Sequence, residues 1–269
     1  MSMALFGKTA RDNRLALGIS ALAVTAFPII LTHAFSSIPL DLLEQWLEVP
    51  WIARIFRAVT GTGVTEAFTV NAMAGFVFVH PVMLAIQWAY VVTGTSRVTV
   101  GEIDRGTADL LLALPISRFG VFVSMNAWML LTAPLLYACV WLGVWIGGAT
   151  ADLAEPFDVW ALRHVVINAF ALLWAVGGIS AAISAAASRR GQALGIVFGI
   201  LVTSYLLNWL AAFWPSVEWL AVVGILHYFR PFAIVRDGGV ATADVVVLLS
   251  VAAVTWVVAA IIFMRRDIP

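Results

Sequence analysis

The chain has few of the residues that give soluble proteins their charge and much of their chemistry. Only 11% of its 269 residues are charged and 62% are hydrophobic, whereas soluble domains are about a quarter charged and about half apolar. The single cysteine, Cys139, lies in a hydrophobic run, which excludes an intrachain disulfide and a cysteine metal cluster. A net charge of zero argues against nucleic-acid binding. The mean hydropathy of +1.00 indicates a polytopic membrane protein.

Motifs of common nucleotide-binding and catalytic sites are also missing. The sequence has no G-x-x-x-x-G-K-[ST] P-loop, no H-E-x-x-H zinc motif and no G-x-S-x-G nucleophile elbow. Its polar connections are too short for an independent soluble core. We therefore predict one transmembrane domain over residues 1–269 that is not an enzyme, with no catalytic residue, metal or cofactor of its own. Any energy source then lies on another chain.

Long apolar runs dominate what is present. A bilayer core roughly 30 Å thick needs about 20 consecutive apolar residues in a helix. Six stretches meet this requirement, at residues 15–35, 67–93, 119–149, 162–188, 192–214 and 242–264. The first is too long for a signal peptide, and no small-residue cleavage site follows it. The predicted fold class is all-α, a polytopic membrane protein with six transmembrane helices.

Lysine and arginine are distributed unequally between the two predicted sides of the membrane. One side carries ten of the fifteen, namely Lys8, Arg11, Arg14, Arg97, Arg105, Arg118, Arg189, Arg190, Arg265 and Arg266. The other five share their side with seven acidic residues of the loops. Because cytoplasmic loops carry the excess of basic residues, we predict a cell (inner) membrane protein with both termini in the cytoplasm.

Three segments outside the spans are predicted to lie at a membrane surface or to enter the membrane only in part. The first fourteen residues alternate apolar and basic positions, which predicts a short helix on the inner membrane surface; the alternative is a basic N-terminus that only sets the topology. Residues 36–66 predict an outer pair of interfacial helices broken at Pro50. The apolar stretch 217–229 is too short to cross the bilayer and suits an outer re-entrant or interfacial helix.

The segment "GEIDRGTADLLLALPISR", residues 101–118, combines charge with a run of leucines between two predicted spans. Thr99 and Glu102 have the spacing of a capping box, which predicts that a cytoplasmic helix starts there. Pro115 predicts its end, and Ser117 then caps the third span. The cytoplasmic segment 99–118 is therefore predicted to contain a helix of about four turns.

Projected on a helix, residues 102–114 have two faces. One face carries Glu102, Arg105, Gly106, Asp109 and Ala113, and the opposite face carries Ile103, Thr107, Leu110, Leu111 and Leu114. An anionic inner leaflet repels the acidic groups of the charged face. A protein partner with basic groups and an apolar groove therefore suits this helix better than the membrane surface. The alternative is an interfacial helix that only connects two spans.

The same segment closely resembles the cytoplasmic coupling segment of type-2 ATP-binding-cassette (ABC) exporter permeases, whose usual pattern is E-x-x-x-G-T-x-E-L-L-L-x-x-P-x-S-R. The matching positions are Glu102, Gly106, Thr107, Leu110, Leu111, Leu112, Pro115, Ser117 and Arg118. Asp109 stands where the family usually has Glu, which keeps the charge. Moderate similarity extends over nearly the whole chain, including residues 204–231 and both ends.

That resemblance implies a six-span permease that pairs with a second permease copy, identical or paralogous, and sits on two ABC ATP-binding subunits. ATP and Mg²⁺ are then on the partner, and the segment docks in a groove of the ATPase. The implied ATPase-coupling residues are Glu102, Arg105, Gly106, Thr107, Asp109, Leu110, Leu111, Leu114, Pro115, Ser117 and Arg118. The substrate is left open among lipid-like molecules, hydrophobic antibiotics and an accessory role in metal or cofactor maturation.

Polar residues inside the spans are candidates for a substrate path. They are His80, Gln87, Asn126 and Asn208. Intramembrane ionisable residues are functional suspects, but hydrogen bonding between helices is the alternative for all four, with Pro81 kinking the second span beside His80. The small residues of 177–188 predict close helix packing.

Three other kinds of function are alternatives to an exporter permease. A proton-coupled secondary transporter needs carboxylates inside the membrane, and Glu66 and Asp244 lie only at span edges. A membrane scaffold is the blander alternative. An intramembrane enzyme needs an acidic or histidine-rich group within the spans, and only His80 is central.

Overall fold

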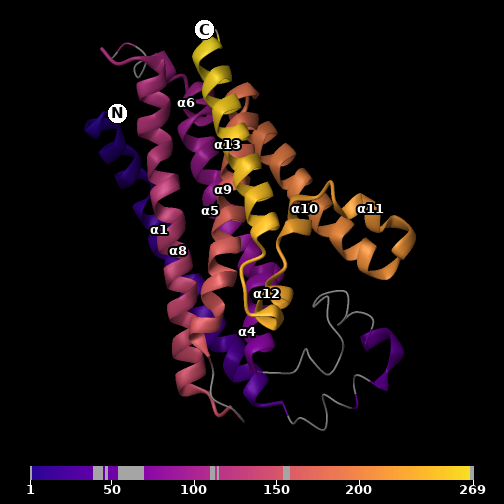
Figure 1. The fold of residues 1–269 in the computed structure, drawn as a ribbon. Helices are drawn as coiled ribbons and strands as arrows, with labels where there is room; N and C mark the ends of the chain where they lie inside the picture. The colour runs from indigo at the N-terminus through magenta and orange to yellow at the C-terminus, as the bar shows by residue number, and fades with distance from the viewer. Residues whose placement is uncertain are drawn as a thin grey trace.

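The computed structural model describes residues 2–38, 45, 48–53, 70–109, 113, 115–153 and 158–266. All regular secondary structure in these ranges is helical. Five of the helices are long and apolar enough to cross a membrane. They are α1 (Met3–Ser36), α8 (Arg118–Thr150), α9 (Arg163–Ala186, preceded by the 3-10 turn η2, Val159–Leu162), α10 (Arg190–Phe213) and α13 (Thr242–Arg265). These helices lie where five of the six apolar runs predict them, in one elongated bundle (Figure 1).

The second predicted span differs from a single continuous helix. It consists of α4 (Val70–Val79) and α5 (Pro81–Val98), separated at His80. Pro81 disfavours helical geometry in the residue before it, and His80 accordingly has an extended backbone with φ −60° and ψ 129°. The His80 ring accepts a hydrogen bond from the amide of Val82 (3.2 Å) and so caps α5. The kink predicted at Pro81 is a break in the helix.

The first helix corrects the prediction for the N-terminus. No separate surface helix covers the first fourteen residues, because α1 runs without interruption from Met3 to Ser36. At about 1.5 Å per residue its length is about 50 Å, which exceeds a hydrocarbon core of roughly 30 Å. The basic first turns of α1 therefore extend the first span rather than turning away from it.

The outer segments differ from their predictions in another way. The stretch 217–229 is not one helix, since it is divided among η3 (Pro215–Val217), α11 (Glu218–Ala221) and η4 (Ile225–Tyr228), followed by α12 (Pro231–Asp237). Gly224 is extended between α11 and η4, and Arg230 leaves the helical region before Pro231. The helix pair predicted in 36–66 falls mostly outside the described residues.

Helix α9 lies at the centre of the bundle, packed between α13, α5, α8 and α10. Small residues allow this packing, as predicted for 177–188. A Cβ atom at Gly178 would lie 2.2 Å from the hydroxyl oxygen of Thr255 on α13. Helices α1 and α8 approach as closely, since a Cβ at Gly143 would lie 2.3 Å from the carbonyl oxygen of Thr25. Within a membrane the hydrophobic effect does not drive helices together, so close backbone contact provides van der Waals packing energy instead.

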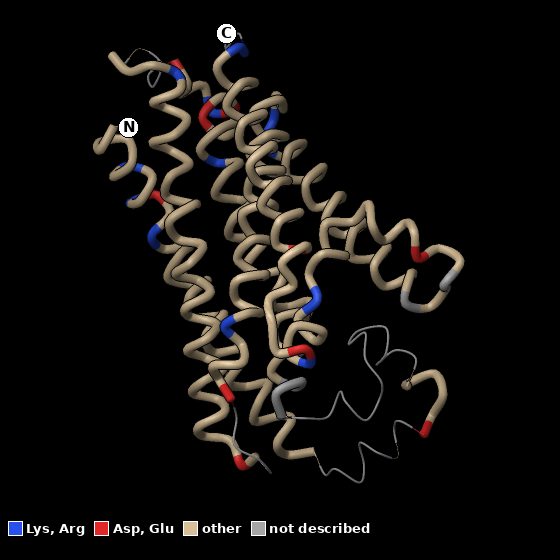
Figure 2. The backbone as a smooth tube through the Cα atoms, viewed as in Figure 1, with Lys and Arg blue, Asp and Glu red and all other residues tan. Residues whose placement is uncertain are grey.

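Charged residues gather toward the ends of the bundle, and the two termini lie at the same end (Figure 2). The connection between α5 and α8 is also at this end, with α6 (Val100–Asp104) as its first element. This end holds basic residues of α1, α5, α10 and α13, whereas the end of α8, which Asp152 follows, lies at the opposite end of the bundle. The connection from α5 to α8 is thus surrounded by basic residues of several helices.

Candidate functional site: the connection between α5 and α8

Helix α6 is shorter than the predicted cytoplasmic helix. It ends at Asp104, and Gly106 has a left-handed backbone with φ 68°. The amide of Gly106 donates to the carbonyl of Ile103 (3.0 Å) and the amide of Thr107 donates to that of Glu102 (2.9 Å). These two bonds form a Schellman motif, which stops a helix at a glycine. The prediction of one continuous helix over 102–114 is therefore wrong, and its two faces do not persist beyond Gly106.

The predicted caps have opposite outcomes. Thr99 does not cap a helix with its side chain, because its hydroxyl donates to the carbonyl of Thr95 within α5. The capping box predicted with Glu102 is wrong. Ser117 does cap α8, as predicted, because its hydroxyl oxygen accepts a hydrogen bond from the amide of Gly120 (3.1 Å).

Glu102 lies at the centre of a polar network that faces into the protein. Its side chain is 8% exposed, and its carboxylate lies 2.9 Å from the Lys8 ammonium and 3.0 Å from the Arg105 guanidinium. The Thr107 hydroxyl donates to its second oxygen. Lys8 also contacts Asp12 on the next turn of α1 (3.2 Å). The predicted charged face of the segment is thus turned at Glu102 toward α1.

The electrostatic balance at Glu102 favours the charged form. Burial by itself raises the pKa of the carboxyl, but the Thr107 hydroxyl, Lys8 and Arg105 act against it and lower the pKa below its ordinary value of 4.5. The network therefore holds a carboxylate at neutral pH, joined across 94 positions of sequence to the first helix.

Basic residues around Glu102 bind backbone carbonyl groups near the helix ends. Arg190, at the start of α10, donates to the carbonyl of Thr93 (3.2 Å), and Arg97 donates to the carbonyl of Asp12 (3.0 Å). Arg266 donates to the carbonyls of Ala185 and Ala187 at the end of α9. The carbonyls of Ala185 and Ala187 lie at the C-terminal end of α9, where a cation is favourable because the last carbonyls lack helical partners. These bonds join α5 to α1 and α10, and they join the end of α9 to the residue after α13.

Beneath these charges the connection has an apolar anchor. Val100 is fully buried, in a small cluster with Ala187 and Ala193 at the junction of α9 and α10. A Cβ at the neighbouring Gly101 would lie 3.2 Å from the carbonyl oxygen of Ser96. The start of the connection is therefore packed against the bundle as well as hydrogen-bonded to it.

The other predicted coupling residues lie on the outside of the connection where they are described. Gly106, Asp109 and Pro115 are exposed, and so is Arg105 although it contacts Glu102. Arg118 turns toward the end of α13, where it donates to the carbonyl of Arg266 (2.6 Å). The predicted residues Leu110, Leu111 and Leu114 lie outside the described residues. The connection thus has an inner part, held by α1 and α10, and an outer part whose exposed residues include Arg105, Gly106 and Asp109, although Ala108 among them is buried.

The four polar residues predicted for a substrate path are not gathered at one place. Gln87 accepts a hydrogen bond from Tyr137, which joins α5 to α8, and Asn126 bonds to the carbonyl of Phe122 on its own helix. His80 caps α5 between the rings of Phe27 and Phe76.

Asn208 is exposed on α10. The bond of Gln87 fits the alternative that such residues connect helices. A role in transport stays a prediction for all four.

Two residues have structural roles that the sequence pattern does not predict. Lys8 is predicted only as part of a basic end, and Gly106 is predicted as a member of a helical face and, through the resemblance, as a coupling residue. A glycine shortly after the last residue of a helix commonly caps its C-terminus. Gly106 follows the end of α6 by two residues, so the sequence contains this signal. The contact of Lys8 with Glu102 has no local signal, because it depends on how α1 packs.

The described residues contain no group of three or more histidine, cysteine or acidic side chains that could hold a metal ion. No protein-family model matches the sequence, and no curated protein matches it.

Proposed function

We propose that this chain is the transmembrane permease subunit of an ATP-driven exporter of the ABC class. It pairs with a second permease copy, and its cytoplasmic end binds two separate ATP-binding subunits that carry ATP and Mg²⁺. The chain performs no covalent chemistry. The observation that carries the proposal is the connection between α5 and α8, which has an anchored inner part and an exposed outer part within the segment that resembles a coupling segment.

Mechanically, the proposal assigns different tasks to the two parts of the connection. Asp109 and the leucines after it bind the ATPase, with the carboxylate facing basic groups of its groove. A displacement of this part passes through Gly106 and Thr107 to Glu102, whose contacts with Lys8 and Thr107 tie it to α1. Val100 and Arg190 pass the displacement to α10 and α5. Packed elements of this kind shift as units.

The spans complete the proposal. Five long helices together with the broken pair α4 and α5 make six crossings, which brings the chain back to the side where it began. We assign the end with the termini to the cytoplasm because most lysines and arginines are there. ATP hydrolysis on the partner then drives the paired bundles between inward- and outward-facing arrangements.

The test is co-purification with an ABC ATP-binding subunit expressed together with this chain. Asp109→Arg places a cation where the proposed groove is basic. Because like charges across an interface cost several kcal/mol, we expect recovery of the complex to fall by roughly tenfold or more. Stimulation of ATP hydrolysis by the permease in vesicles should fall with it.

Asp152→Arg is the matched control, since Asp152 is also an exposed aspartate but lies at the opposite end of the bundle. We expect this variant to bind the ATPase like the wild type. If Asp109→Arg retains both complex formation and ATPase stimulation, the docking role of the connection is wrong.

A further inference from the structure

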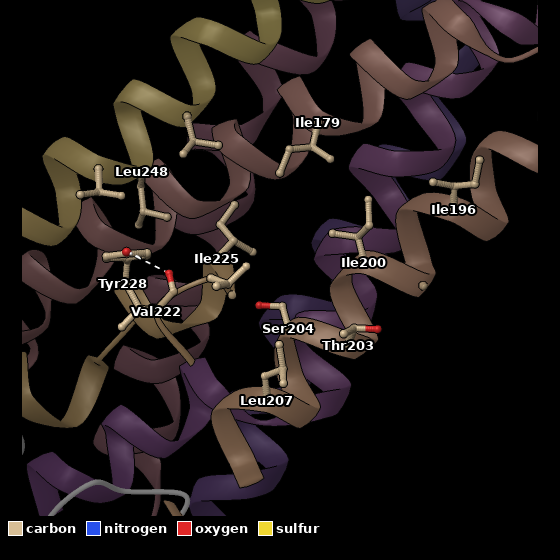
Figure 3. Close-up of a pocket in the computed structure, with 15 residues that line it drawn as sticks. Ile179, Ile196, Ile200, Thr203, Ser204, Leu207, Val222, Ile225, Tyr228 and Leu248 are labelled. Atoms are coloured by element: carbon tan, nitrogen blue, oxygen red, sulfur yellow. Dashed lines mark hydrogen bonds between the residues drawn. The ribbon is translucent and has the colours of Figure 1, made fainter. Parts of the chain in front are cut away.

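A cavity of about 600 Å³ lies between α10, α13 and the 3-10 turn η4, away from the connection described above. Figure 3 shows Ile196, Ile200 and Leu207 of α10 on one side of it, with Ile225 and Leu248 among the side chains that face them. Its lining comes largely from the middle of helices that are long and apolar enough to cross a membrane. The medium around it is therefore lipid rather than water.

The chemistry of the lining excludes ionic ligands and disfavours strongly polar ones. None of the fifteen described lining residues is charged, and most are aliphatic. The hydroxyl of Tyr228 already donates to the carbonyl of Val222 (3.0 Å), and the hydroxyl oxygen of Ser204 accepts from the amide of Leu226 (3.0 Å). A polar ligand would lose its hydrogen bonds to water on entering the cavity and regain few from the lining, so its binding would be unfavourable.

The cavity lies where α10 separates from the rest of the bundle and carries a glycine. Helix α10 diverges from the bundle toward the outer segment (Figure 1), and in the described structure it makes few contacts with α13. Gly199 contributes no side chain, and a Cβ there would meet no atom within 4 Å. Ile196 and Ile200 are each more than 40% exposed beside it, so the cavity opens on the outer surface of α10.

The size of the cavity decides between a helix and a thinner occupant. A transmembrane helix of a second copy would pack across the opening at an axis distance of roughly 8–10 Å, so only its side chains would enter this space. Pockets of roughly 300–1,000 Å³ suit small ligands, and the cavity of about 600 Å³ falls in this range. A single hydrocarbon chain is thin, apolar and abundant in the surrounding medium.

We propose that this cavity is a binding site for one acyl chain of a membrane phospholipid, held between α10 and η4. The site does not depend on an ATP-binding partner and goes beyond the proposed transport function. An acyl chain bound there would hold α10 against the outer segment, because the acyl chain contacts both α10 and η4.

The test uses purified protein in vesicles of phosphatidylethanolamine and phosphatidylglycerol that contain a photoreactive phospholipid. One probe carries the reactive group at the end of an acyl chain, and a second carries it on the headgroup. We expect the acyl-chain probe to label peptides within residues 190–213 and 218–237 more than the other lipid-facing helices. The headgroup probe should not show this preference.

Gly199→Leu fills the cavity and should lower labelling of these peptides by about fivefold or more. Gly191→Leu is the matched control, because Gly191 is also on α10, has nothing within 4 Å and does not line the cavity. Thr203→Leu, at another lining position, is the second filling variant in case Gly199→Leu does not fold. Thermal unfolding checks that each variant is folded.

Three results would overturn the inference. One is labelling that is spread evenly over all lipid-facing helices, which indicates only annular lipid. Another is equal labelling in the wild type and in folded filling variants. The third is crosslinking of the lining peptides to a second copy of the chain by a bifunctional reagent in the same vesicles, which identifies protein rather than lipid as the occupant.

Discussion

Glu102, Asp104 and Asp109 are three acidic residues within eight positions, but the structure separates them by their surroundings. Glu102 is buried and contacts Lys8, Arg105 and Thr107, whereas Asp104 and Asp109 are exposed. A buried carboxylate needs such partners, because an unpaired one costs far more free energy than an exposed one. We therefore assign Glu102 an internal, positioning role and leave binding of a partner to Asp109.

The Glu102 network should make stability depend on pH. The pKa of Glu102 is lowered in the folded protein, so its contribution to the free energy of unfolding is present above the ordinary value of 4.5 and is lost as the pH falls through the lower, folded-state pKa. We expect Glu102→Gln to cost about 1 kcal/mol at pH 7, since Lys8 and Arg105 are partly exposed and screened by solvent. Unfolding in detergent, followed by tryptophan fluorescence, measures the difference.

The difference between wild type and Glu102→Gln should shrink below pH 4.5 as the wild-type carboxylate becomes protonated. Asp104→Asn is the control, because Asp104 is exposed two positions away, and its effect should be small at every pH. A Glu102→Gln effect that does not change with pH would contradict the ion-pair explanation.

At the scale of elements, local backbone chemistry decided where α6 ends. The leucine run and the charged positions around it fit one helix, yet the Schellman motif at Gly106 stops α6 two residues earlier. A left-handed backbone is inexpensive for glycine and costly for residues with a Cβ atom. The connection consequently changes direction at Gly106 instead of continuing as a rod.

Replacement of Gly106 tests this turn. Gly106→Val should lower the free energy of unfolding by about 1–2 kcal/mol, because a β-branched residue is strained at positive φ. Gly106→Asn should cost less, since asparagine tolerates the left-handed region. Equilibrium unfolding in mixed micelles compares the two, with Gly191→Val as a control on a glycine without positive φ. Equal losses for Val and Asn would show that backbone strain at Gly106 is not the cause.

At the scale of the whole molecule, the bundle has two chemically different ends. The termini and the α5–α8 connection share one end, where arginines bind the carbonyls of neighbouring helix ends. Away from this end, Arg230 binds Asp244, near the start of α13, through two hydrogen bonds of 2.9 and 2.6 Å. The edge carboxylate that a proton-coupled transporter would use is thus already paired with a cation.

Labelling of single cysteines tests the orientation. In a Cys139→Ser background, Met3→Cys reports on the end with the termini and Asp152→Cys on the opposite end, and both positions are exposed. An impermeant maleimide added to intact cells or spheroplasts should label only Asp152→Cys, because basic residues stay in the cytoplasm. Both should react after lysis, while the background protein stays unlabelled. Labelling of Met3→Cys from outside would contradict the predicted orientation.

Much of the helical architecture is predictable from hydropathy. A backbone in hydrocarbon must satisfy its own hydrogen bonds, so an apolar run of sufficient length can only be a helix. For this reason five predicted spans correspond to long helices, and the position of Pro81 located the break before α5. The predictions for the N-terminus, 102–114 and 217–229 were less accurate. At the N-terminus the residue pattern did not show that α1 continues without a break. In the other two segments it did not show the helix cap at Gly106 or the turn at Gly224.

Composition and local pattern were enough to establish a helical membrane protein, its long helices and the cap of α8 at Ser117, because each depends on neighbours in sequence. The inward orientation of Glu102 depends instead on Lys8, 94 positions away, which reaches it only after α1 has packed beside α5 and α8. The cavity beside Gly199 likewise follows from the divergence of α10 from the bundle. Contacts between distant segments, and the spaces left between them, are properties of packing that no local pattern contains.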